Sequence, residues 1–223
     1  MKLRTHAPAI VALIAASHLA SPAAAQLGGL RNLVPGANTS TAASVDPDAF
    51  LAETVETTKM MMIAAALLAD ASNHDTNRDS IRAKITAIQG VSSIDELNTH
   101  TDAFREDAKA AEATAGDAAA LQAAYDAASK DQQELMMTAA YNFSLAMARN
   151  VRLGQQGSQL IGNLRTNPMM LTKLGSIRSA GSLIGLQAQA ARSMGGPLRT
   201  LLSRGGVEAP ADASTAQART VSV

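Results

Sequence analysis

Residues 60–69 read MMMIAAALLA, and this stretch decides the fold class of the chain. Every position is apolar, so a helix formed by this stretch has no polar face to turn toward water. Asp46 followed by Pro47 predicts where that helix begins, because Asp caps a first turn and Pro suits the first helical position. We therefore expect a central, buried helix from Pro47 to about Ser72.

The overall composition favours helices in the rest of the chain. The 223 residues include ten Met but no Cys, no Trp, three Phe and two Tyr. Ala and Met have high helix propensity, whereas the β-branched and aromatic residues that favour strands are scarce. Without Cys, stability has to come from packed apolar area rather than from disulfides. The composition predicts an all-α fold.

Local patterns divide residues 46–206 into a bundle of about five helices. A helix near residues 79–89 carries Ile81, Ile85 and Ile88 at positions i, i+4 and i+7 and ends at Gly90. Ser93 and Glu96 form a capping box for a third helix. These helices are short and joined by short turns, which favours antiparallel neighbours.

The second half of the bundle contains the longest predicted helices. Gly116-Asp117 begins a fourth helix that reaches at least Leu153, where Gly154 and Gly157 are expected to bend or end it. Asn167-Pro168 begins a fifth helix to about Met194, and residues 195–197, Gly-Gly-Pro, are expected to break it. A short last helix over 198–204 then ends at Gly205-Gly206.

The two ends of the chain are predicted to lie outside the bundle. Residues 1–25 combine a basic start, an apolar run of 12 residues (9–20) and Ala23-x-Ala25, the pattern of a signal peptide cleaved after Ala25. The run is shorter than the roughly 20 residues that span a bilayer. We expect a soluble periplasmic protein with a flexible lead-in over 26–45 and a disordered tail over 207–223.

Charge is distributed unevenly along the bundle. Residues 46–134 contain 17 acids and 7 bases, a net charge of −10 (7 − 17). Residues 135–207 contain no acid and eight bases: Arg149, Arg152, Arg165, Lys173, Arg178, Arg192, Arg199 and Arg204. These bases could bind an anionic envelope component or an acidic protein, or they could neutralise the acidic helices within the bundle. Both interpretations stay open.

One short stretch resembles a calcium-binding loop. Asp75-x-Asn77-x-Asp79 matches its first three ligand positions, but Ser80 stands where Gly is needed and Thr86 where Glu is needed. A polar turn between helices explains the same residues better. His74 and His100 are read as ordinary surface residues beside polar turns, so we predict no metal site.

Three groups of methionines suggest a copper(I) site as an alternative to core packing. They are Met60–Met62, Met136-Met137 and Met169-Met170. Thioethers are soft ligands for Cu(I), but adjacent residues on a helix point about 100° apart and do not converge. Met is also a flexible filler of cores. Core packing is the preferred interpretation, and no cofactor is predicted.

Motifs for catalysis and for nucleic-acid binding are missing from the sequence. There is no G-x-S-x-G, no Cys nucleophile and no glycine-rich phosphate loop. Aromatic residues for stacking on nucleic-acid bases are too few. We expect neither an enzyme nor a nucleic-acid partner, although an enzyme of an unrecognised type stays an alternative.

Gly181-x-x-x-Gly185 has the spacing that lets a second helix approach closely. Two interpretations stay open here. One is tight packing inside the bundle, and the other is a homodimer formed through these glycines. A membrane span is not expected, because Lys173, Arg178 and Arg192 flank the pair too closely.

The last third of the chain resembles a group of uncharacterised, exported, all-helical proteins of Gram-negative bacteria. The similarity rests on Tyr141 to Leu153, on Lys173 to Ile177 and on Gly206 to Asp212. It implies export and a helical fold, and it brings no functional residue.

Together these features predict a non-enzymatic periplasmic interaction module that binds a protein or an anionic envelope component. The alternative is a helical bundle that holds an apolar ligand such as a lipid in its Met- and Ala-rich interior.

Overall fold

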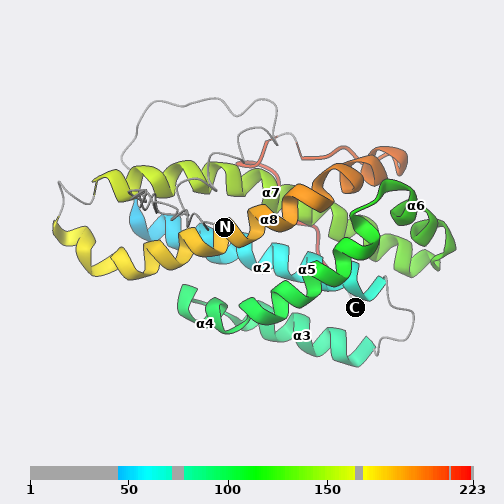
Figure 1. Ribbon diagram of the computed structural model, residues 1–223, viewed down its shortest axis with the longest axis horizontal. Coiled ribbons are helices and arrows are strands. Elements are labelled where there is room, and N and C mark those ends of the chain that lie inside the picture. The colour runs from blue at the N-terminus through cyan, green and yellow to red at the C-terminus, as the bar shows by residue number, and fades with distance from the viewer. Residues whose placement is uncertain (1–44, 72–77, 164–167, 211, 222–223) are drawn as a thin grey trace, which may run out of the picture.

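In the computed structural model the chain forms an all-α bundle. The structure describes residues 45–71, 78–163, 168–210 and 212–221. These contain seven α-helices, one 3-10 helix and no strand (Figure 1). The helices are α2 (Pro47–Ala71), α3 (Arg78–Gly90), α4 (Ile94–Thr99), α5 (Thr101–Ala115), α6 (Ala118–Ala127), α7 (Lys130–Asn163), the 3-10 helix η2 (Pro168–Lys173) and α8 (Leu174–Arg204). The predicted signal peptide and the lead-in before Val45 lie outside the described residues.

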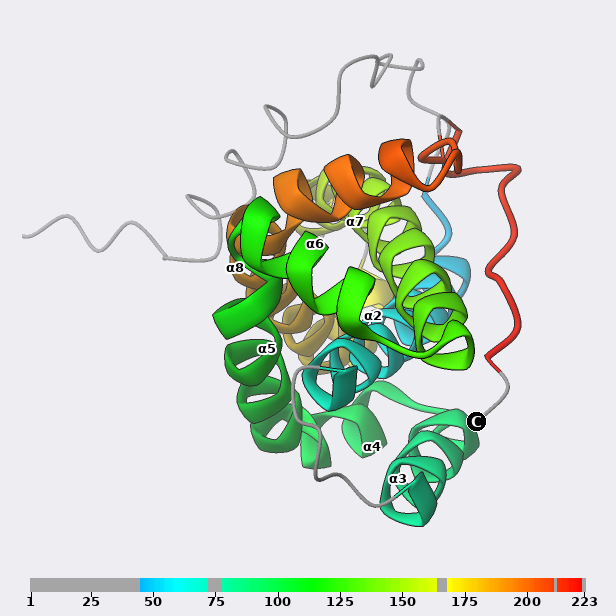
Figure 2. The same ribbon diagram turned by 90° about the vertical axis from the view of Figure 1, so that its right-hand side faces the viewer.

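Helix α2 is the central element, as the sequence predicts. All nine residues from Met60 to Leu68 are buried. The helix contacts α3, α4, α5, α7 and α8, and in Figure 2 it runs between α5 and α7. At its start, the Asp46 carboxylate accepts a hydrogen bond from the backbone N–H of Asp48 at 2.8 Å. The expected Asp-Pro helix start is confirmed.

A buried polar chain joins the three longest helices. The Gln187 amide of α8 donates to the Thr58 hydroxyl of α2 at 2.7 Å. The Asn150 amide of α7 donates to the Gln187 carbonyl oxygen at 2.8 Å. All three side chains are buried. Because an unpaired polar group in a core is costly, these bonds fix how α2, α7 and α8 lie against one another.

Two predicted helices are each divided in the structure. The Ser93 cap is present, with its hydroxyl accepting from the Glu96 N–H at 3.2 Å, but α4 ends at Thr99 and α5 begins at Thr101. The predicted fourth helix is divided between α6 and α7. There Ser129 caps α7, and its N–H donates to the Gln132 side chain at 3.0 Å. Ser129-x-x-Gln132 is itself a capping box, a signal in the sequence that predicts this start.

The expected helix breaks at internal glycines are wrong. Helix α7 continues through Gly154 and Gly157, and α8 continues through Gly195, Gly196 and Pro197. The reason is close packing: a Cβ at Gly157 would lie 3.3 Å from the Phe50 ring, and one at Gly195 would lie 3.0 Å from the Met147 sulfur. These glycines let side chains of neighbouring helices approach the backbone. The apolar face of each helix is buried on both sides of them.

The end of α8 agrees with the prediction, but the tail does not. Gly206 has φ 68°, and the N–H groups of Gly206 and Val207 donate to Ser203 and Leu202. This is a Schellman cap, which favours glycine at the left-handed position. The sequence predicts a disordered tail from Val207. Instead, residues 207–210 and 212–221 follow a defined course, because polar groups of α7 hold their backbone.

The close approach at Gly195 leads to a stability prediction. Gly195→Val should lower the free energy of unfolding by about 1–3 kcal/mol, because the added methyl groups collide with Met147. A Cβ at Gly181, on the same helix, meets nothing within 4 Å, so Gly181→Val should stay within about 0.5 kcal/mol of the wild type. Urea unfolding measures both, and equal stability of the two variants would contradict the packing described here.

Candidate functional site

The eight basic residues of 135–207 do not form one surface. Arg152 pairs with Glu53 and Lys173 pairs with Asp48, so two of them neutralise acids of the α2 region. Arg149 binds the C-terminal segment, and Arg204 donates to the Gln122 side chain at 3.3 Å. Arg178 and Arg192 are exposed and Arg199 is half-buried. Arg165 lies outside the described residues. Neutralisation within the bundle thus accounts for part of the basic half, but not for all of it.

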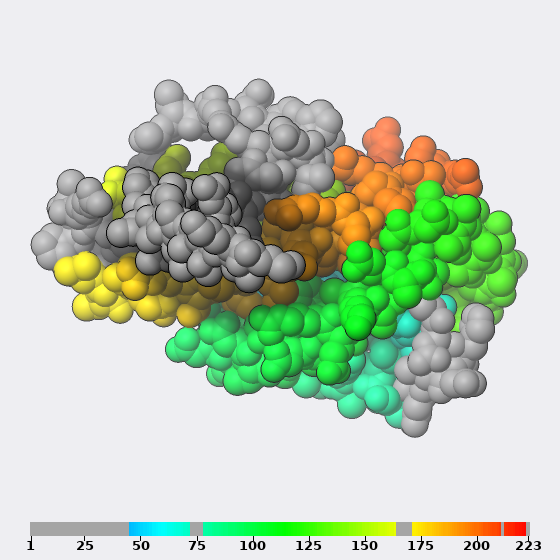
Figure 3. Space-filling view, viewed as in Figure 1, coloured from blue at the N-terminus to red at the C-terminus, as the bar shows by residue number. Residues whose placement is uncertain are grey.

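A groove between α5 and α8 is the best candidate for a ligand site. Its volume is about 760 Å³, and it opens on the face shown in Figure 3, where α5 lies against α8. The side chains that line it are Phe104, Arg105, Ala108, Lys109 and Glu112 of α5, and Leu186, Gln189, Ala190, Arg192 and Ser193 of α8. The groove therefore brings together residues of the acidic half and the basic half of the sequence.

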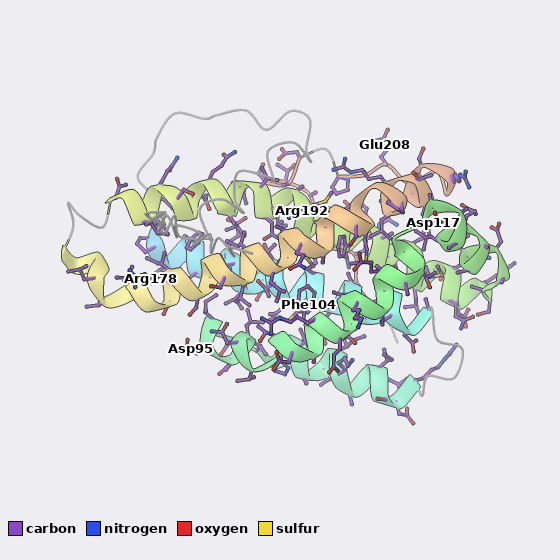
Figure 4. All side chains as sticks on the ribbon, viewed as in Figure 1. Asp95, Phe104, Asp117, Arg178, Arg192 and Glu208 are labelled. Carbon is purple, nitrogen blue, oxygen red and sulfur yellow. The ribbon has the colours of Figure 1, made fainter. Side chains whose placement is uncertain are left out.

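Cations and apolar side chains share this groove, which we call the α5–α8 groove. Phe104 is only 2% exposed and anchors its apolar floor, and Figure 4 shows it near Arg192. Arg105, Lys109 and Arg192 contribute three positive charges against the single carboxylate of Glu112. Lys109 and Arg192 form no ion pair within the described residues. The arrangement provides an apolar surface with an excess of positive charge beside it.

Sequence reasoning named only one of these cations, Arg192. Arg105 and Lys109 lie within residues 46–134, whose net charge is negative. The net charge of that segment therefore does not reveal these two cations. Their spacing of four residues places both on one face of α5, which is a signal that the sequence does carry. That this face meets Arg192 depends on the packing of α5 against α8.

Two polar side chains of α7 bind the C-terminal segment, residues 212–221. The Asn142 amide donates to the backbone carbonyl of Arg219 at 2.9 Å and accepts from its N–H at 2.8 Å. The Arg149 guanidinium donates to the carbonyls of Ala213 at 3.2 Å and Ala216 at 2.8 Å. The sequence leaves Arg149 open between an anionic partner and neutralisation of the acidic helices, whereas the structure shows it bound to backbone carbonyls.

The two carboxyl groups with resolved pKa shifts both belong to local turns. Hydrogen bonds from the N–H and then the hydroxyl of Ser92 lower the pKa of Glu96. The Ser214 hydroxyl, followed by the Ser214 N–H and the Thr215 hydroxyl, lowers the pKa of Asp212, and the Arg152 charge adds to this. Both groups are exposed and stabilise turns.

The residues considered for metal binding do not gather in the described part of the chain. The described residues contain no group of three or more His, Asp or Glu side chains placed to hold an ion. Asp79 pairs with Arg82 at 3.0 Å, His100 lies between α4 and α5, and Asp75, Asn77 and His74 fall outside the described residues. Met60–Met62 and Met136-Met137 are buried in the core, as core packing predicts. The side chains of Met169 and Met170 are not described.

The two glycines of the pair on α8, Gly181 and Gly185, have different surroundings inside the bundle. Gly185 is buried, but a Cβ at Gly181 would meet nothing within 4 Å. Close packing within the chain therefore does not explain Gly181. A homodimer through this pair stays a prediction.

Among the described helices, none combines the length and the apolar character needed to cross a bilayer. No family model, no curated protein and no solved structure matches this chain.

The Asp212 turn leads to a pH prediction. Its folded pKa lies below the ordinary value of 3.8. The turn is therefore stabilised above that ordinary value, and the stabilisation is lost as the pH falls through the lower folded pKa. Amide hydrogen exchange at Ser214, corrected for its intrinsic pH dependence, should accelerate relative to α7 below about pH 4. Asp212→Asn should remove this pH dependence, and an unchanged profile in that variant would contradict the assignment.

Proposed function

We propose that this chain is an exported, periplasmic, non-enzymatic binding protein whose α5–α8 groove takes a single anionic amphiphile of the cell envelope. Such a molecule has an acyl chain and a negatively charged head group. The proposal rests on one observation: three cations, Arg105, Lys109 and Arg192, lie beside an apolar floor in one open groove.

The size of the groove supports a small ligand. Its volume of about 760 Å³ falls in the range of about 300–1,000 Å³ that is usual for small-molecule sites. Phe104, Ala108, Leu186 and Ala190 supply apolar surface for an acyl chain. An amphiphile can place its acyl chain on the apolar side chains of the groove and its head group beside the three cations.

The charges support an anionic head group. Arg192 and Lys109 have no ion-pair partner in the described structure, so a ligand anion would not have to displace one. Arg105 pairs with Asp102 on the surface, and such an exposed pair contributes little to stability. Arg105 can therefore turn from Asp102 toward a ligand at low cost.

Binding of dansyl-labelled undecanoic acid tests the proposal. Arg192→Glu should weaken binding by about tenfold or more, since it removes a charge-assisted hydrogen bond and adds repulsion. Arg178→Glu is the matched control. Both arginines are exposed on α8, and positions 14 residues apart lie about 40° apart around the helix and about 21 Å apart along it. Arg178 does not line the groove.

The outcomes separate this proposal from its competitors. The uncharged methyl ester of the probe should bind more weakly, and added salt should weaken binding of the acid. Equal losses in the two arginine variants would indicate general charge attraction and contradict the groove assignment. If acidic peptides bind with the same dependence on Arg192 while the fatty acid does not, the partner is a protein and the amphiphile proposal fails.

A further inference from the structure

We propose that the surface formed by α2, α3 and α7 is a binding site for a peptide segment of a partner protein, and that residues 212–221 of the chain occupy it in the partner's absence. We call this surface the tail groove. Figure 2 shows the C-terminal segment running along α7 on the side of the molecule opposite α5. The tail groove is thus separate from the α5–α8 groove, and the inference does not depend on the amphiphile proposal.

Recognition in the tail groove is directed at the peptide backbone. Asn142 binds both the N–H and the carbonyl of Arg219, at 2.8 and 2.9 Å. Arg149, two helical turns further along α7, binds the carbonyls of Ala213 and Ala216. Each of these bonds uses a group that every non-proline residue carries. The same contacts are therefore available to a segment of another protein that forms the same turn, in which the Ala216 N–H donates to the Asp212 carbonyl at 3.1 Å.

Two side chains add a sequence preference. The Arg219 guanidinium lies 4.4 Å from the centre of the Tyr141 ring, a cation–π contact. Val221, two residues later, packs against the hydrophobic core. The tail groove therefore favours an arginine followed, after one residue, by an apolar residue.

The tail fills this groove incompletely. A space of about 360 Å³ stays open between residues 218–221 and the helices, lined there by Glu56, Lys59, Met60 and Ile63 of α2 and by Gln89 of α3. Dispersion contacts are lost wherever a lining atom has no neighbour. A segment with a larger apolar residue in the position of Val221 would gain contacts with Met60 and Ile63. Such a segment could displace the tail, which leaves α8 through Gly205 and Gly206.

A partner protein fits this site better than a second copy of the chain. A segment tethered by a short flexible linker reaches its own site at an effective concentration on the order of millimolar. The tail of a second copy brings the same sequence and no better contacts, so it competes only at comparable protein concentrations. A partner segment with better contacts can compete at much lower concentration.

Fluorescence anisotropy with a fluorescein-labelled peptide of residues 212–221 tests the inference on the full-length chain. Arg219→Pro weakens the tethered tail, because it removes the N–H bound to Asn142 and the cation over Tyr141. The wild type should bind the peptide weakly, since its own tail competes. The Arg219→Pro chain should bind the peptide at least about tenfold more tightly, because its own tail no longer competes for the groove. A peptide of the same composition in scrambled order should not bind.

Two further variants in the Arg219→Pro background show where the peptide sits. Arg149→Leu should abolish binding, whereas the matched Arg178→Leu, which lies outside the groove, should leave it unchanged. Asn142→Ala gives a second test, and thermal melts followed by circular dichroism verify that each variant is folded. Equal binding by the wild type and the folded Arg219→Pro chain overturns the inference, and so does binding of the scrambled peptide.

Discussion

The burial of nine consecutive residues of α2, from Met60 to Leu68, is the constraint on which the rest of the structure depends. A helix with an apolar surface all round cannot lie at the edge of a bundle, because some of its side chains would then face water. Neighbours are needed on every side, and α3, α4, α5, α7 and α8 supply them. The short helices α3, α4 and α5 have a structural role here, since they cover the part of α2 that α7 and α8 leave open.

The same constraint sets the polar contacts of the bundle. Thr58 enters the core with the apolar stretch, and it is satisfied by Gln187, which in turn accepts from Asn150. Nearer the start of α2 the surface is reached, and there Glu53 and Asp48 pair with Arg152 and Lys173. The contrast between an acidic and a basic half is therefore partly resolved at the contacts of α2 with the second half of the chain. Of the exposed arginines Arg178 and Arg192 of α8, Arg192 lies where α8 meets α5 and Arg178 lies outside the α5–α8 groove.

The two proposed binding surfaces differ in chemistry and lie on opposite sides of the bundle. The α5–α8 groove combines three cations with an apolar floor, which suits an anionic amphiphile. The tail groove uses Asn142 and Arg149 to bind main-chain groups, which suits a peptide segment. Together, the two proposals describe a protein that joins an anionic amphiphile to a protein partner. Each surface can be tested alone, because their lining residues do not overlap.

Local propensity, apolar pattern and capping predict the all-α fold, the central position of α2, the buried isoleucines of α3 and the end of α8 at Gly205-Gly206. The sequence also carries the Ser129-x-x-Gln132 cap and the Arg105–Lys109 spacing, which can be read from neighbouring residues. Gly157 and Gly195 allow close packing instead of ending helices, and no local pattern predicts this, because it depends on Phe50 and Met147 from other helices. The tail is the clearest case. Its own composition has too little apolar surface to order it, and it is held because α7 places Asn142 and Arg149 opposite backbone groups at positions 64 to 77 residues further along the chain.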